Sequence, residues 1–411
     1  MKDNPSTVQN LSAIKWLTFL MFMMFAMTTD SVGVIIPEVI KEFHLSMTVA
    51  GAFHYAAMSG IAVAAFFLGY LADKLGRKRT IILGLVLFAL NSYLFAIGRS
   101  FVFFIVLLTI SGAAIGIFKT GALALIGDIS TSTTQHTATM NAVEGFFAVG
   151  AIIGPAIVTH FLAVGISWKW LYVIAGSICV LLIVISSLVR YPQTTTSTEG
   201  VDLRRTVLMM KNPYALGFSA AIFLYVAVES AIYVWMPTLL GGYHGPAAWM
   251  AAYAISIFFV LRAAGRFIGS WMLARLNWAA VVTVFSLAIF VCFVVSTVGG
   301  IGIAVFLLPL SGLFMSVLYP TINSKGISCF RKSEHGAVAG VILFFTCLSA
   351  VLGPLAMGAI SDTFGDPKYG FILATAFAAV LFVGLLLNWI FNPARSLLQK
   401  LDATEYQAVR A

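Results

Sequence analysis

The chain has 411 residues, of which 61% are hydrophobic and only 9% are charged. Soluble domains carry about 25% charged residues, so this composition excludes an ordinary soluble protein and indicates an integral membrane protein. Four cysteines without CxxC or zinc spacing predict neither a disulfide framework nor a metal site.

Apolar runs of about 20 residues predict bilayer-spanning helices, and they follow one another along this chain. The first run continues from Lys15 through Pro37 without a small-residue cleavage site, which favours an uncleaved span over a signal peptide. We predict twelve spans, at residues 15–38, 48–72, 79–98, 101–127, 138–163, 167–189, 213–240, 247–274, 278–298, 301–324, 335–361 and 368–391. The polar, Thr-rich segment 190–212 is a cytoplasmic linker in this interpretation. It separates an N-terminal six-helix bundle, 1–189, from a C-terminal six-helix bundle with a short cytoplasmic tail, 213–411.

The basic residues predict the orientation. With the N-terminus in the cytoplasm, the inner segments hold 17 of the 24 Lys and Arg, the outer loops hold four and the spans hold three. The positive-inside rule therefore places both termini in the cytoplasm. The net charge of +9 then reflects membrane topology, so we do not expect the protein to bind nucleic acid. We expect it to lie in a lipid bilayer, the cell inner (plasma) membrane.

The two halves of the sequence resemble each other. The segments "HTATMNAVEGFFAVGAIIGPAI" and "HGAVAGVILFFTCLSAVLGPLAM" begin 199 positions apart, at His136 and His335. Their Gly-Pro steps keep the same spacing, and we take them as gating positions: Gly154, Pro155, Gly353 and Pro354. Parallel repeats of six spans imply a pseudo-two-fold axis along the membrane normal, an architecture of transporters that rock two bundles around a central site.

The loop between spans 2 and 3 reads "GYLADKLGRKRT" and carries one acid and four bases. Its glycines, Gly69 and Gly76, allow close helix approach and a tight turn. Asp73 lies at a helix end, where it can pair with a base or cap a neighbouring helix N-terminus. Together with Arg77 and Lys78, these residues form a candidate gate that latches one conformation.

The same loop resembles the signature of the major facilitator superfamily, G-x-L-a-D-r-x-G-r-k. The matching residues are Gly69, Leu71, Ala72, Asp73, Gly76, Arg77 and Lys78. The resemblance covers nearly the whole chain and implies an all-α membrane fold of two six-helix bundles, with this loop as a gate element. The second half keeps "GRFIGSWMLARL" but has no acid at the place of Asp73, so a second latch would be degenerate.

A narrower resemblance is to the fucose:proton symporter group, through the span-5 run "MNAVEGFFAVGAIIGP" and the span-1 acid Asp30. It implies a sugar or related polyol as substrate and protons as the coupling ion. The prototype of that group carries an acid in span 4 before a Thr, whereas this sequence has Lys119 there.

Charged side chains inside the spans suggest a structural or functional role, because inserting each one costs about 2.5–3.5 kcal/mol at the bilayer centre. A helix rise of about 1.5 Å per residue places Lys119 and Glu144 at a similar depth in the membrane. The same count places Glu229 and Arg262 at a similar depth to each other. Each pair is either a structural ion pair or part of a binding site. An acid whose basic partner moves away during rocking gains and loses a proton, which is a route to proton coupling for Glu229 and Glu144.

Further candidates surround these charges. Asp30 lies somewhat outside the middle of span 1, Arg266 lies one turn from Arg262 in a Gly-rich segment typical of a gate, and Asp128 ends span 4 near the inner gate. Side chains that could stack on or hydrogen-bond to a sugar are Asn141, Tyr233, Trp235 and Asn323. Packing within the membrane is the alternative role for each of them.

The function indicated is secondary active transport of a small polar solute, a sugar or polyol in preference, by a monomer that couples to protons. The chain has no G-x-x-x-x-G-K-[ST] motif, which argues against ATP as energy source, and scattered His without HExxH or GxSxG argue against an enzyme. We expect no cofactor. The alternatives are an organic anion or sugar acid transporter, a proton-driven drug efflux pump, and a membrane receptor.

Overall fold

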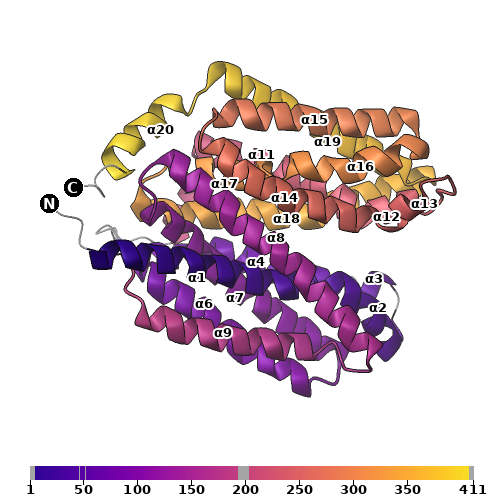
Figure 1. Cartoon of the computed structure of the whole chain (residues 1–411), viewed down its shortest axis with the longest axis horizontal. Coiled ribbons are helices and arrows are strands. Elements are labelled where there is room, and N and C mark those ends of the chain that lie inside the picture. Colours follow the sequence, from indigo (N-terminus) through magenta and orange to yellow (C-terminus); the bar gives the residue numbers. More distant parts are fainter. Residues whose placement is uncertain (1–4, 46, 51, 193–202, 407–411) are drawn as a thin grey trace. The chain divides into compact units, whose positions relative to one another are not determined.

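The computed structural model describes residues 5–45, 47–50, 52–192 and 203–406 (Figure 1). Within these ranges the chain is helical and contains no strand, which confirms the predicted all-α fold. Eleven helices in these ranges are long and apolar enough to cross a membrane, and the shorter apolar helix α4 (Ala52–Leu68) lies where the second span is predicted. The predicted linker falls partly on residues 193–202, outside the described residues. The side on which the termini lie remains a prediction.

By their contacts the residues form two compact units. Unit 1 comprises Met1–Ser130, Phe146–Asn212 and Phe330–Phe344, and unit 2 comprises Thr131–Gly145, Pro213–Cys329 and Phe345–Ala411. Two long helices are therefore shared. The first turns of α8 (Thr133–Ala163) belong to unit 2 and its remainder to unit 1, while the first turns of α18 (His335–Phe364) belong to unit 1 and its remainder to unit 2.

Unit 1 is built on α4, which packs on α7, and on α6, which packs on both α7 and α9. Besides α4 and the shared helices, its elements are α1 (Pro5–Thr29), α2 (Val32–Phe43), α3 (Met47–Ala50), α5 (Leu71–Lys74), α6 (Arg77–Leu94), η1 (Phe95–Ile97), α7 (Phe101–Asp128), α9 (Trp170–Leu188), α10 (Leu203–Met209) and η3 (Lys332–Glu334). Close packing of α4 on α7 depends on glycine, because a methyl group on Gly60 or Gly112 would collide with the backbone of the other helix.

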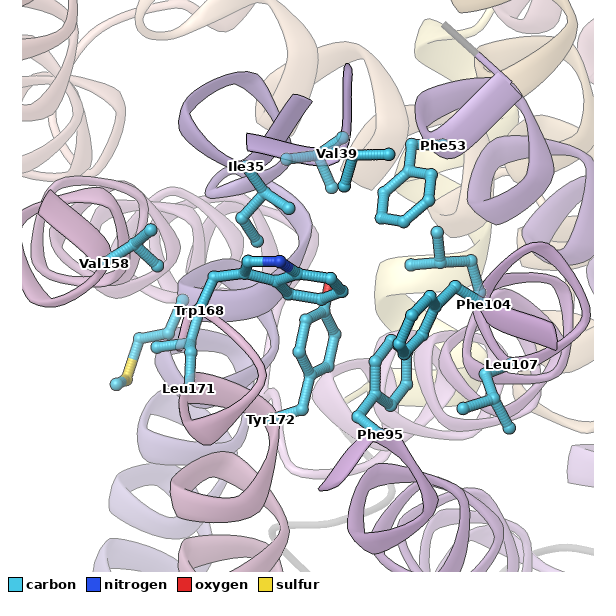
Figure 2. Packing of buried hydrophobic residues seen from close by; sticks show 13 residues of the cluster. Ile35, Val39, Phe53, Phe95, Phe104, Leu107, Val158, Trp168, Leu171 and Tyr172 are labelled. Carbon is cyan, nitrogen blue, oxygen red and sulfur yellow. The ribbon is translucent and has the colours of Figure 1, made fainter. Parts of the chain in front are cut away.

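The core at one end of unit 1 is aromatic (Figure 2). Trp168 lies among Phe53, Phe95 and Phe104, and the rings of Phe95 and Tyr172 stack with their centroids 3.8 Å apart. Aromatic contacts of this kind contribute about 0.5–1.5 kcal/mol beyond burial of area. The cluster therefore fixes α7, α9 and the turn after α6 as one body.

Unit 2 repeats the scheme, with α15 packed on α16 and α19, α14 on α16, and α11 on α17 and α19. Besides the shared helices, its elements are α11 (Pro213–Ser230), the π-helical turn η2 (Ala231–Trp235), α12 (Met236–Leu240), α13 (Ala248–Ala252), α14 (Ala254–Leu273), α15 (Trp278–Gly299), α16 (Ile301–Met315), α17 (Leu318–Ser328), α19 (Lys368–Phe391), α20 (Arg395–Leu401) and the π-helical turn η4 (Asp402–Tyr406).

The Gly-Pro steps occupy equivalent places in the two repeats. A methyl group on Gly154 of α8 would meet the carbonyl of Met27 in α1, and one on Gly353 of α18 would lie 3.1 Å from Ala227 in α11. Pro155 and Pro354 follow inside their helices. These glycines allow the fifth helix of each repeat to lie against the first.

Several predicted spans are not continuous helices. The first is broken at Asp30–Ser31, the seventh by η2, the eighth at Tyr253, and the tenth at Ser316–Val317. Hydroxyl groups compete for helix carbonyls at two of these breaks: Ser31 donates to Met27 over 2.6 Å, and Ser316 donates to Leu313 over 2.6 Å. Breaks of this kind place backbone groups and polar side chains inside the membrane region, which is tolerated where they are buried in protein or line a cavity.

Candidate functional site

A carboxylate latch joins the loop after α4 to the first turn of α18 within unit 1. Asp73, which is fully buried, accepts hydrogen bonds from the backbone amides of Gly336 and Ala337, both over 2.9 Å. The free amides and the dipole of a helix N-terminus favour a negative group at this position. Asp73 also pairs with Arg77 over 2.5 Å. Both contacts expected of this acid, a base and a helix cap, are present.

Arg77 is the centre of the latch. Its guanidinium donates to Asp73, to Asp128 over 2.9 Å, and to the backbone carbonyls of Ala72 and Lys332. The Lys332 ammonium lies 3.5 Å and 3.4 Å from the carbonyls of Asp128 and Ser130. Two acids and two bases thus balance in a buried cluster. Burial raises the pKa of Asp73, and the charge of Arg77 and the two amides oppose that rise.

The other loop residues have separate tasks. Gly76 has φ of 85°, a conformation that favours glycine, and it directly precedes α6. Gly69 lies so close to Gly340 that a methyl group would be 3.1 Å from its Cα atom. Lys78 donates to the carbonyls of Ser187 and Val189, both over 2.9 Å, so it holds the end of α9. Gly69 and Gly76 therefore shape the latch, whereas Lys78 contacts α9.

The equivalent first turn of α8 is held in unit 2 by the C-terminal tail. Asp402 accepts from the backbone amide of Thr133 over 2.7 Å and from its hydroxyl over 3.0 Å. Lys325 donates to the Thr133 carbonyl over 3.1 Å. The second half of the sequence indeed lacks an acid in the loop after α14, but Asp402 supplies one from η4. No local pattern in the sequence indicates this partner.

Neutral contacts complete this second cap. His136 lies 2.7 Å from the Ser328 hydroxyl, which lies 3.2 Å from the hydroxyl of Tyr406. Ser270 donates to the Ala138 carbonyl over 3.0 Å. The second cap thus combines the charged groups of Asp402 and Lys325 with hydroxyl and imidazole groups.

The buried charges of unit 2 converge on α11 and α14. Glu229 pairs with Arg262 over 2.6 Å, so the candidate pair suggested by helix depth is present. The Tyr225 hydroxyl lies 2.7 Å from the same Glu229 oxygen and 2.9 Å from the backbone carbonyl of Met315. Both Tyr225 and Glu229 are buried. The π-helical turn η2 begins two residues after Glu229, and Pro237 follows it in α12.

Within unit 2, Glu144 is paired with Arg266, a partner that helix depth alone did not suggest. Arg266 donates to the Glu144 carbonyl over 2.7 Å and lies 3.4 Å from its carboxylate. The reason is that the first turns of α8 lie against α14 in unit 2. In unit 1, the Lys119 ammonium instead lies over the rings of Phe147, at 4.7 Å, and Phe22, at 5.8 Å. Such cation–π contacts favour a desolvated ammonium.

The remaining candidates are spread over both units. Asp30 occupies the break between α1 and α2, where the Thr29 hydroxyl donates to it over 2.9 Å. Asn141 donates to the Thr137 carbonyl and to the Thr321 hydroxyl, over 2.9 Å and 3.3 Å. Trp235 donates to the Pro354 carbonyl over 3.2 Å and is half-buried, as is Tyr233. Asn323 is buried in α17.

These features define a class of protein: a helical membrane transporter with repeated bundles, discontinuous spans and buried charges. The family model of the Major Facilitator Superfamily matches residues 18–354. The chain belongs to the major facilitator superfamily, and this confirms the resemblance seen in the loop after α4.

Two relatives of different activity are similar to the chain. It is 23% identical over 407 residues to the L-fucose-proton symporter of Escherichia coli (strain K12), covering 88% of this chain and 90% of that protein. It is 25% identical over 343 residues to the quinolone resistance protein NorA of Staphylococcus aureus (strain MRSA252), covering 79% and 86%. Membership of the superfamily makes the chain a transporter.

Solved structures show the same fold. The superfamily transporter FucP in the outward conformation superposes with a TM-score of 0.78 at 21% identity, covering 92% of this chain and 99% of that chain. The proton:xylose symporter XylE superposes with a TM-score of 0.72 at 12% identity, covering 94% and 96%.

Proposed function

We propose that the chain is a proton-coupled symporter for a sugar or related polyol, working as a monomer in the inner membrane by alternating access. The observation that carries the proposal is the buried Glu229–Arg262 pair with Tyr225, next to η2 and facing the break after α16. Support comes from the similarity over 88% of the chain to a protein named as an L-fucose-proton symporter.

Glu229 is the proposed proton carrier. When ionised, it neutralises Arg262 at 2.6 Å; when protonated, it leaves the guanidinium able to turn toward a solute hydroxyl. A buried Arg262 without an ionised Glu229 costs several kcal/mol, and a solute hydroxyl that binds the guanidinium offsets part of that cost. Protonation of Glu229 and solute binding therefore favour each other. Glu144 and Arg266 form a second acid–base pair one helical turn along α14, able to relay the change to the first turns of α8.

The latch at Asp73, Arg77 and Asp128 is the proposed inner gate. Its closure requires the amides of Gly336 and Ala337 in α18, and its opening hydrates two carboxylates and a guanidinium. The Gly-Pro steps in α8 and α18 are the proposed flexible points. The tail contact of Asp402 with α8 is the corresponding gate contact of the second repeat.

The test is uptake of radiolabelled L-fucose into proteoliposomes under an imposed pH gradient. We expect accumulation by the unmodified protein and equilibration without accumulation by Glu229→Gln. The matched control is Glu38→Gln, whose exposed pair with Lys41 contributes little. Accumulation by Glu229→Gln at the unmodified level would show that Glu229 does not carry the proton.

A second candidate function is proton-driven efflux of quinolones. It is favoured by 31% identity over 161 residues to NorA proteins of Staphylococcus aureus. An organic anion is less favoured, because Arg262 and Arg266 are already ion-paired with carboxylates of the protein. The same vesicles, loaded with norfloxacin, distinguish the candidates: extrusion driven by the pH gradient, without L-fucose uptake, would favour efflux.

A further inference from the structure

The hydrogen bonds of Tyr225 need one more proton than an ionised neighbour provides. The phenol oxygen lies 2.7 Å from a carboxyl oxygen of Glu229 and 2.9 Å from the carbonyl oxygen of Met315. A phenol has one proton to donate, and both a carboxylate and a backbone carbonyl only accept. Tyr225 is completely buried, so with an ionised Glu229 its single proton fully serves only one of the two acceptors, whereas a neutral Glu229 can donate to the phenol oxygen and leave that proton to Met315.

The two protonation states therefore give two arrangements of the same atoms. With a neutral Glu229, the carboxyl donates to Tyr225 and Tyr225 donates to Met315. With an ionised Glu229, the phenol O–H rotates toward the carboxylate, and the Met315 carbonyl loses its donor. One proton arrives at or leaves Glu229, the phenol O–H changes its acceptor, and no covalent bond of Tyr225 is broken.

Met315 occupies a sensitive place in the fold. It is the last residue of α16, and the helix is interrupted at Ser316–Val317 before α17 begins at Leu318. The last carbonyls of a helix have no partner inside it, so the hydrogen bond from Tyr225 is a main tie between α11 and the end of α16. Leaving a buried carbonyl without such a bond is unfavourable, which favours movement at the break.

We propose that Tyr225 is a positioning residue that transmits the protonation of Glu229 to the break between α16 and α17; this rests on the proton coupling proposed above. Arg262 contacts Glu229 directly from α14. Other titratable groups act on this network electrostatically: Arg266 on α14, Glu144 on α8, and Tyr319 on α17 with Cys347 of α18 beside it. None of them contacts the Met315 carbonyl, so Tyr225 alone links that carbonyl to the acid among the contacts described.

The experiment is infrared difference spectroscopy between acid and alkaline pH on the full-length purified protein labelled with carbonyl-13C methionine. Met315→Leu keeps the backbone but removes the label, which assigns the Met315 band among the 15 methionines. Glu229→Gln assigns the carboxyl band. Acidification is expected to add a neutral carboxyl band in both the unlabelled and the labelled protein. In the labelled protein it is also expected to shift the Met315 carbonyl band to lower frequency.

In Tyr225→Phe, the carboxyl band is expected to remain while the Met315 shift is lost. The matched control is Tyr172→Phe, whose buried hydroxyl has no hydrogen-bond partner among the described residues; both signals are expected to persist in it. A Met315 shift that survives Tyr225→Phe or Glu229→Gln overturns the proposal. So does its absence from the unmodified protein, a result that stands even when a variant fails to fold. The measurement needs no solute, so a failure of L-fucose transport is a separate result.

Discussion

Removing the Asp73 carboxylate should open the latch in unit 1. Asp73→Ala deletes two hydrogen bonds to the first turn of α18 and leaves Arg77, which is 1% exposed, with Asp128 as its remaining acid. Loss of a helix cap costs about 0.5–2 kcal/mol, and breaking a buried ion pair costs about 3–5 kcal/mol. Because these contributions overlap, we expect a total of about 3–5 kcal/mol. Every 1.4 kcal/mol is tenfold, so the closed population should fall at least roughly a hundredfold relative to the open one.

Spin labels on exposed residues of the two joined segments, Lys74 and Arg331, report this equilibrium as a distance distribution. We expect one short distance in the unmodified protein and a longer population in Asp73→Ala. Asp128→Asn is the graded control, since Asp128 binds Arg77 without touching α18. It should open the latch less. An equal effect of the two substitutions, or none from Asp73→Ala, would refute the role assigned to the α18 amides.

Three further outcomes are expected. Glu229→Gln should destabilise the protein by about 3–5 kcal/mol in chemical denaturation because Arg262 stays buried without its acid, and adding Arg262→Gln should recover part of that loss. Asp402→Ala should cost about 1 kcal/mol and increase hydrogen exchange at the Thr133 amide, whereas unchanged protection would contradict the capping role. Because burial raises the pKa of Asp73, a closed latch binds that proton more tightly than a hydrated, open one. Closure is therefore favoured below the raised pKa and loses this contribution as the pH rises through it, which the same spin labels measure; an opposite trend would exclude this linkage.

The fold could be predicted from the sequence because a run of about 20 apolar residues is enough to identify a membrane span. Apolar length was sufficient to predict the helices, and the loop signature at Gly69–Lys78, with the spans and the half-repeat, was sufficient to predict the family. The breaks at Ser316 and after Ser230 were not predicted, because a hydroxyl that bonds its own helix and a π-helical turn leave the hydropathy unchanged.

The candidate site was predictable only in part. Counting residues along straight helices placed Glu229 level with Arg262, and the two do pair. The same count did not suggest Arg266 as a partner of Glu144, because depth carries no information on which helices are neighbours. The contacts of Tyr225 could not be predicted, since they depend on the end of a helix 90 residues away in sequence.

The cap on α8 comes from a residue 269 positions further along the chain, so a segment synthesised late completes a helix synthesised much earlier. Until Asp402 emerges from the ribosome, the amide of Thr133 lacks this acceptor. Shortening the chain after Leu401, or attaching bulky cargo close behind Tyr406, would therefore disturb the fifth helix of the first repeat while leaving every predicted span intact.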